Sequence, residues 1–162
     1  MSSPEEALKT AVINYLSGDG VSVLNKQTIS RYSTLFSIQE MNDNSELFDS
    51  KSATLNDNFT IVDIITHIIN VPSQTLFDPN IIPNRPDMTI DIYNQHKEQI
   101  PFNLEYSSVP IDDILLTLPS EQINWSNISQ RRDFTKQTIL DNISNMTADD
   151  LQNIINKRPN LL

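Results

Sequence analysis

Residues 60–71 read Thr-Ile-Val-Asp-Ile-Ile-Thr-His-Ile-Ile-Asn-Val, and apolar side chains are denser here than elsewhere in the chain. They recur at spacings of three and four, which favours a helix with one buried face. Isoleucine is β-branched and also suits a strand, so a strand stays open as the alternative. We predict a buried helix over this stretch.

The segment that follows, residues 72–86, carries four of the chain's nine prolines. Proline lacks an amide donor and restricts the residue before it, so this segment is not expected to form a regular helix or strand. It also holds four bulky apolar side chains, Leu76, Phe77, Ile81 and Ile82. These predict an irregular arm that either wraps the parent domain or docks on a partner chain, and we take the four as candidate partner-binding residues.

The region before the arm, residues 1–71, begins with the clearest local signal. Ser3 and Pro4, followed by Glu5 and Glu6, are typical of a capped helix start. The chain's two glycines, Gly18 and Gly20, predict where that helix ends. Residues 23–41 suit a second helix, and the polar residues 42–58 predict a surface loop.

The region after the arm, residues 87–162, suits either helix or strand at its start. Alternation of Phe102, Leu104 and Tyr106 with polar residues predicts a short strand. Further on, residues 108–118 and 127–146 show helical spacing, and a second capping pattern starts at Thr147. No internal repeat is apparent.

The fold class that follows is mainly α. We expect a small helical domain with a long irregular proline-rich arm, and a minor β element around residues 88–106 as an open alternative. The regions 1–71, 72–86 and 87–162 are expected to form one domain overall, since 162 residues are ample for a single core.

Composition excludes several kinds of chemistry. The chain has no Cys, which excludes disulfides, thiolate metal sites and a cysteine nucleophile. Two glycines are too few for a phosphate-binding loop or a nucleophile elbow. His67, four residues after Asp63, and His96 have no evident third metal ligand. We therefore expect no enzyme activity, no catalytic residues, no metal and no cofactor.

The charge of −10 is concentrated in the middle of the chain, where residues 61–119 hold eight acidic and two basic side chains. Such a field argues against nucleic acid and favours a basic protein surface. One alternative function is therefore an acidic regulator that covers a basic, nucleic-acid-handling protein. A second is a helix-turn-helix-like DNA-binding regulator, suggested by Gly20-Val21-Ser22 and by residues 25–31, which end at Arg31.

The principal expectation is a non-enzymatic interaction or assembly component that joins other protein chains in a larger complex. Besides the arm, the candidate partner-binding residues are the sole tryptophan, Trp125, and the basic pair Arg131 and Arg132. No apolar run is long enough to cross a membrane, and no signal peptide is evident at the start. The 21 Ile and 18 Asn residues suggest a bacteriophage virion or assembly protein, located in the cytoplasm or the virion.

Overall fold

The computed structural model describes residues 3–71, 73 and 76–162, and within these residues it contains helices and turns but no strand. The prediction of a mainly α chain is confirmed. The α-helices are α1 (Pro4–Ser17), α2 (Val23–Tyr32), α3 (Ile38–Asp43), α4 (Ser50–Thr54), α5 (Ile61–Asn70), α6 (Ile90–His96), α7 (Ile111–Thr117), α8 (Trp125–Ile128), α9 (Lys136–Asn142) and α10 (Ala148–Lys157). Short 3-10 helices lie between and after them: η1 (Ser45–Leu47), η2 (Ile82–Asn84), η3 (Ser120–Gln122), η4 (Ile143–Asn145) and η5 (Pro159–Leu161).

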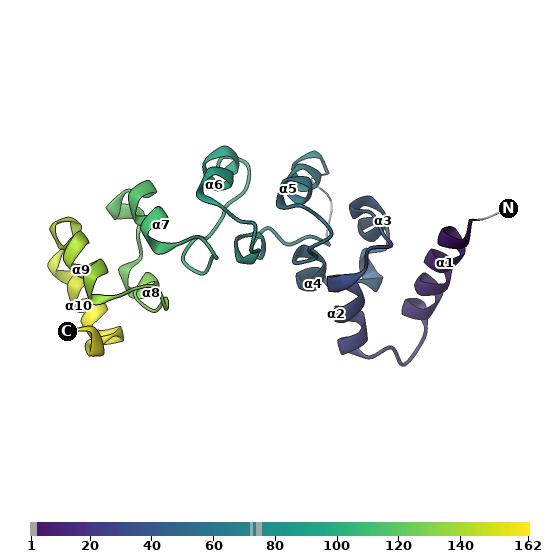
Figure 1. Cartoon of the computed structure of the whole chain (residues 1–162), viewed down its shortest axis with the longest axis horizontal. Helices are drawn as coiled ribbons and strands as arrows, with labels where there is room; N and C mark the ends of the chain where they lie inside the picture. Colours follow the sequence, from purple (N-terminus) through teal and green to yellow (C-terminus); the bar gives the residue numbers. More distant parts are fainter. Residues whose placement is uncertain (1–2, 72, 74–75) are drawn as a thin grey trace.

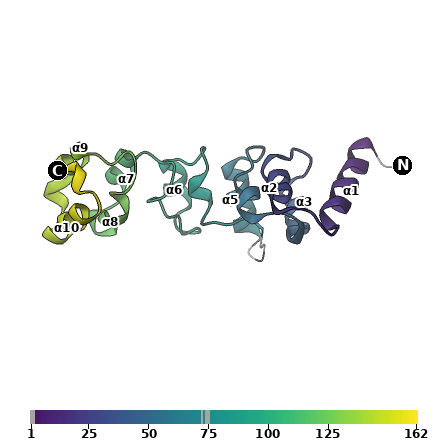
Figure 2. The same ribbon diagram turned by 90° about the horizontal axis from the view of Figure 1, so that it is seen from below.

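The molecule is elongated, and the chain runs along the long axis from one end to the other, with the two termini at opposite ends (Figures 1 and 2). In Figure 1, α3, α5, α6 and α7 form an upper row, while α2, α4 and α8 lie below them. Contacts run along the rows: α3 packs on α5, α6 on α7, α2 on α4, and α8 on α10. The chain is therefore a stack of helical layers rather than a globule around one centre.

A local pattern recurs at the start of five helices, α3, α5, α6, α7 and α9. The capping residues are Ser37, Thr60, Thr89, Pro110 and Thr135. The residue immediately before each cap is a buried apolar side chain: Phe36, Phe59, Met88, Val109 and Phe134. Except at Pro110, the capping hydroxyl accepts a hydrogen bond from the helix backbone, which satisfies a free amide. This local pattern recurs although the sequence shows no evident internal repeat. We call each such cap, with the segment before it and the helix after it, a unit.

The predicted minor β element around residues 88–106 is not confirmed, because this stretch contains α6 and then turns. The backbone carbonyls of this alternating segment accept hydrogen bonds from a side chain, and no second strand pairs with them among the described residues. The carbonyls of Leu104 and Glu105 accept hydrogen bonds from Arg131, at 3.2 and 3.5 Å. Since buried backbone groups need a partner of some kind, a guanidinium takes the place that a neighbouring strand would have filled.

The expected proline-rich arm is not confirmed either. Leu76 and Phe77 are each 2% exposed and Ile82 is fully buried, while Ile81 is half-buried. The segment is tied to α4, since the amide of Asp78 donates to Thr54 Oγ1 at 2.9 Å. Of the two alternatives that the sequence left open, packing within the chain therefore holds for these side chains. The part of the predicted arm at residues 72, 74 and 75 lies outside the described residues.

The polar stretch 42–58 is not a simple surface loop. It contains η1 and α4, and Phe48, Ala53 and Asn56 within it are buried. Its apolar side chains join the core, where Phe48 meets Phe36 edge to face at 5.3 Å between ring centroids. Asn56 is buried because its amide group bonds to backbone carbonyls of the preceding unit, as described below.

Candidate functional site

Of the three predicted partner-binding residues outside the arm, two make their contacts within the chain itself. Trp125, the first residue of α8, is 2% exposed, and its ring lies in the core. Arg131 is largely buried and fully engaged in hydrogen bonds, whereas Arg132 is exposed and makes no ion pair among the described residues. Of the predicted residues, Arg132 and the half-buried Ile81 therefore remain accessible.

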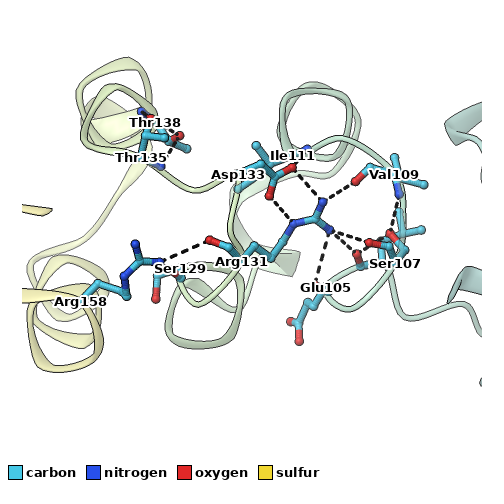
Figure 3. A network of polar contacts seen from close by, with 11 residues as sticks. Glu105, Ser107, Val109, Ile111, Ser129, Arg131, Asp133, Thr135, Thr138 and Arg158 are labelled. Carbon is cyan, nitrogen blue, oxygen red and sulfur yellow. Dashed lines mark hydrogen bonds and ion pairs between the residues drawn. The ribbon is translucent and has the colours of Figure 1, made fainter. Parts of the chain in front are cut away.

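The guanidinium of Arg131 joins two units of the stack (Figure 3). Its Nη1 donates to the carbonyls of Leu104 and Ser107, each at 3.2 Å, and its Nη2 donates to the carbonyl of Val109 at 2.5 Å. Asp133 holds the guanidinium from the other side, with Nε and Nη2 donating to its two carboxylate oxygens at 2.8 and 3.0 Å. The same carboxylate accepts from the amide of Ile111, the first residue of α7, at 2.9 Å. One Arg-Asp pair thus fixes both the loop and the helix of the preceding unit.

Arg85 and Asp87 repeat this arrangement two junctions earlier along the chain. Arg85 is 2% exposed and donates to three carbonyls of the preceding unit, those of Thr54, Asn56 and Phe59, at 2.6–3.0 Å. Asp87 accepts from Arg85 Nε and Nη2 at 2.9 and 3.1 Å, and from the amide of Ile61, the first residue of α5, at 3.0 Å. Two-point pairing of this kind gives the guanidinium a fixed orientation.

Three further junctions also bond to backbone carbonyls of the preceding unit. Asn56 Nδ2 donates to the carbonyls of Ser30 and Ser33, at 2.9 and 3.1 Å. Ser108 Oγ donates to the carbonyl of Arg85 at 2.7 Å, and its amide to that of Pro83 at 3.1 Å. Arg158 Nη1 donates to the carbonyls of Ser129 and Arg131, at 2.8 and 3.3 Å (Figure 3). We call these five side chains the inter-unit clamps: Asn56, Arg85, Ser108, Arg131 and Arg158.

The two aspartates that pair with clamp arginines, Asp87 and Asp133, are stabilised in their ionised form. The hydrogen bond from Arg131 is the main reason that the pKa of Asp133 lies below its ordinary value, and it outweighs the opposing effect of burial. At Asp87, burial opposes ionisation most strongly. The hydrogen bonds from Arg85 and the Ile61 amide together exceed it, so the pKa of Asp87 is lowered as well. These groups hold the stack together and are not poised to exchange protons with a substrate near neutral pH.

The described residues contain no group of three or more His, Asp or Glu side chains that could hold a metal ion. The capping pattern predicted at Thr147 is confirmed, because Asp150 forms a capping box with Thr147 at the start of α10. His67 packs edge to face on Phe77 with its Nε2 unpaired, and burial lowers its pKa.

Surface hollows lie between units, and the sequence predicts none of them. One, of about 450 Å³, lies between α2 and α4. Its lining residues are Gln27, Thr28, Arg31, Tyr32, Asp49, Lys51, Ser52 and Leu55, and we call it the α2–α4 groove. Another, of about 400 Å³, lies beside Tyr106, Asn127 and Arg132. Spacing along the chain gives no signal for either hollow, because each is formed by two units that only the fold brings together.

In the part of the chain that the structure describes, no helix has the length and apolar character needed to span a membrane. Comparison with known proteins adds no relationship. No protein family model matches the chain, and neither curated proteins nor solved structures give a match.

Proposed function

We propose that the chain is a non-enzymatic interaction or assembly component whose stacked units offer an extended surface to other protein chains. The observation that carries this proposal is the extent of that surface. The accessible area is 9475 Å², whereas a compact protein of 18.4 kDa is expected to expose about 8,200 Å². Stacked helical repeats are typical binding scaffolds, because neighbouring units hold one another while their outer faces stay free.

Exposed apolar side chains on the helices add to this support. Leu116 on α7 is 86% exposed, and Leu140 on α9 is 54% exposed. On α5, Val62 is 47% exposed although Ile61 beside it is buried. Apolar groups that the stack does not cover gain free energy when a partner covers them. The predicted origin in a bacteriophage virion, and a location in the cytoplasm or virion, stay proposals that rest on composition alone.

The test is the mass of the native particle that contains this chain, measured after purification from the cells in which it is made. We expect a particle heavier than the 18.4 kDa chain, with a second component or further copies in fixed ratio. Leu116→Ser should lower the fraction of chain in that particle and leave the unfolding temperature unchanged. The control is Asn153→Ser, at an exposed polar position on α10.

A native chain found only as an 18.4 kDa monomer would contradict the proposal, and so would equal effects of the two variants. The charge of −10 supports a second candidate, an acidic regulator that covers a basic protein. That candidate predicts a basic second component whose binding weakens steeply as salt is raised, because salt screens exposed charges. Binding that salt does not weaken would exclude it.

A further inference from the structure

Two positively charged side chains line the α2–α4 groove, although the net charge of the chain is −10. Arg31 and Lys51 both line it, and neither forms an ion pair among the described residues. This distinguishes them from Lys9, which pairs with Glu6 and Glu40, and from Arg85 and Arg131, which are held in the clamps.

Arg31 is placed to receive an acceptor from outside the chain. Its guanidinium lies 5.8 Å from the centre of the Tyr32 ring, within the range of a cation–π contact. Its Nε is shielded by the surrounding chain, and none of its nitrogens has a hydrogen-bond partner among the described residues. The terminal nitrogens are not shielded in this way, so they are available to donate to an acceptor in the groove.

The groove's own carboxylate does not fill this role. Asp49 lies at the N-cap of α4, where its Oδ2 accepts from the amide of Ser52 at 2.9 Å and from the Ser52 hydroxyl at 2.6 Å. Asp49 therefore serves the start of its own helix, and the two cations are left facing solvent.

We infer that the α2–α4 groove binds a carboxylate side chain of an extended acidic segment in a partner protein, with Arg31 and Lys51 supplying the charge. This inference rests on the proposed function and names the chemistry of one partner contact. Tyr32, 66% exposed, and Leu24, 70% exposed and one turn before Thr28 on α2, flank the groove and suit apolar side chains next to the carboxylate.

An acidic peptide fits this groove better than nucleic acid does. Binding to a phosphate backbone draws on many cations that neutralise successive phosphates. Here two cations stand in a region, residues 1–60, that holds eight acidic and four basic side chains. Two cations match one or two carboxylates, whereas the surrounding acidic groups would repel a long polyanion.

The experiment is a titration of the ¹⁵N-labelled full chain, followed by amide chemical shifts. The probe is a blocked peptide of ten residues in which two Glu stand among eight Ser, and the matched control peptide has Gln in place of both Glu. We expect saturable shifts centred on the amides of residues 27–32 and 49–55 with the Glu peptide and none with the Gln peptide. Shifts centred elsewhere, or equal shifts with the two peptides, would overturn the inference.

Matched variants assign the effect to the two cations. Arg31→Gln together with Lys51→Gln should weaken the Glu peptide about tenfold or more, the range expected for charge-assisted hydrogen bonds. Lys136→Gln together with Lys157→Gln removes the same charge from two exposed, unpaired lysines and should change the affinity less than about twofold. If the double variant unfolds, the single variant Lys51→Gln, at an exposed position, replaces it in the titration and should also weaken binding of the Glu peptide. Equal losses in the two pairs would show a general charge effect and end the proposal.

Two further titrations separate the remaining outcomes. Inorganic phosphate should give weaker shifts than the Glu peptide, and a DNA duplex should give none in the groove. A DNA duplex that binds there more tightly than the peptide would replace this inference with a nucleic-acid site. A groove that binds nothing, in a chain that still occurs in a heavier native particle, would overturn this inference and leave the proposed function standing.

Discussion

Arg85 and Asp87 lie two residues apart and pair at two points, 2.9 and 3.1 Å, while each also bonds to the backbone of the preceding unit. Arg131 and Asp133 have the same spacing and form the same pairs, at 2.8 and 3.0 Å. The surrounding carbonyls come from loops of different sequence. The recurring feature of the stack is therefore a group of backbone carbonyls before each helix cap, which bond mainly to a side chain of the next unit.

Arg85→Ala should lower the free energy of unfolding by about 3–5 kcal/mol, since it leaves three carbonyls and the Asp87 carboxylate without their partner. Urea denaturation followed by circular dichroism measures the change. Arg85→Lys should recover little of it, because an ammonium lacks the planar fork that reaches these acceptors. Arg132→Ala, at an exposed arginine, is the control and should stay within about 0.5 kcal/mol of the parent chain. Similar losses for the two alanine variants would contradict the clamp.

Phe134→Ala tests the buried residue that precedes each cap. Phe134 is 1% exposed, and its truncation should cost about 3–5 kcal/mol through lost burial and the cavity left behind. Leu140→Ala, at a side chain that is 54% exposed, should cost less than about 1 kcal/mol. Calorimetric unfolding of the two variants checks the difference. If the Leu140 variant were the less stable of the two, the assignment of the core would be wrong.

Asp133 should make the free energy of unfolding depend on pH in the acid range. Hydrogen bonding from Arg131 lowers the pKa of Asp133 in the folded chain, so the carboxylate stabilises the fold above the pKa of an unfolded aspartate, about 3.9. That contribution is lost as the pH falls through the lower folded pKa. Asp133→Asn should therefore flatten the fall in unfolding free energy below about pH 4.

The matched control for that acid titration is Asp112→Asn. Asp112 accepts no hydrogen bond from any described residue, so its variant should keep the slope of the parent chain. Equal slopes in the parent and in Asp133→Asn would show that the clamp aspartate is not coupled to folding.

His67 should affect the stability of the fold in a different pH range. Burial lowers the pKa of His67 in the folded chain, so protonation favours the unfolded state, and stability should fall as the pH drops below about 6.5. His67→Gln should remove this decline, whereas His96→Gln, which alters the other histidine, should keep it. Thermal unfolding between about pH 7.5 and about pH 5 measures it. If the decline in stability disappeared in the His96 variant instead, its assignment to His67 would be wrong.

Helix starts were predictable because their signals are local. Ser3 caps α1 with its hydroxyl bonded to the Glu6 amide, and the capping box expected at Thr147 is present. The helix predicted from residues 60–71 is confirmed as α5, with its buried face formed by Ile61, Ile64 and Ile65. In each case the residues that decide the structure lie within one or two turns of one another.

The stack and its clamps were not predictable in the same way. The clamp position holds asparagine, arginine or serine in different units, and the distances between units vary, so no fixed period appears. A weaker signal was present: Ile82 and Ile128 stand three residues before the two Arg-x-Asp motifs, and each motif is followed by a bulky apolar residue and a threonine. The prolines of residues 72–86 predicted a segment without a regular helix or strand, whereas its described part contains the short 3-10 helix η2 and packs against α4 and α5 of the same chain.

Because each clamp reaches back to the unit immediately before it, tension applied at the two ends of the molecule passes through every junction in series. The Asn56 and Ser108 junctions, each fastened by two neutral hydrogen bonds, are weaker than those closed by an arginine and an aspartate. A chain stretched between two attachments would therefore lengthen in steps, opening first at these two junctions and later at those held by an arginine and an aspartate. The order in which the molecule yields to force is thus set by single side chains.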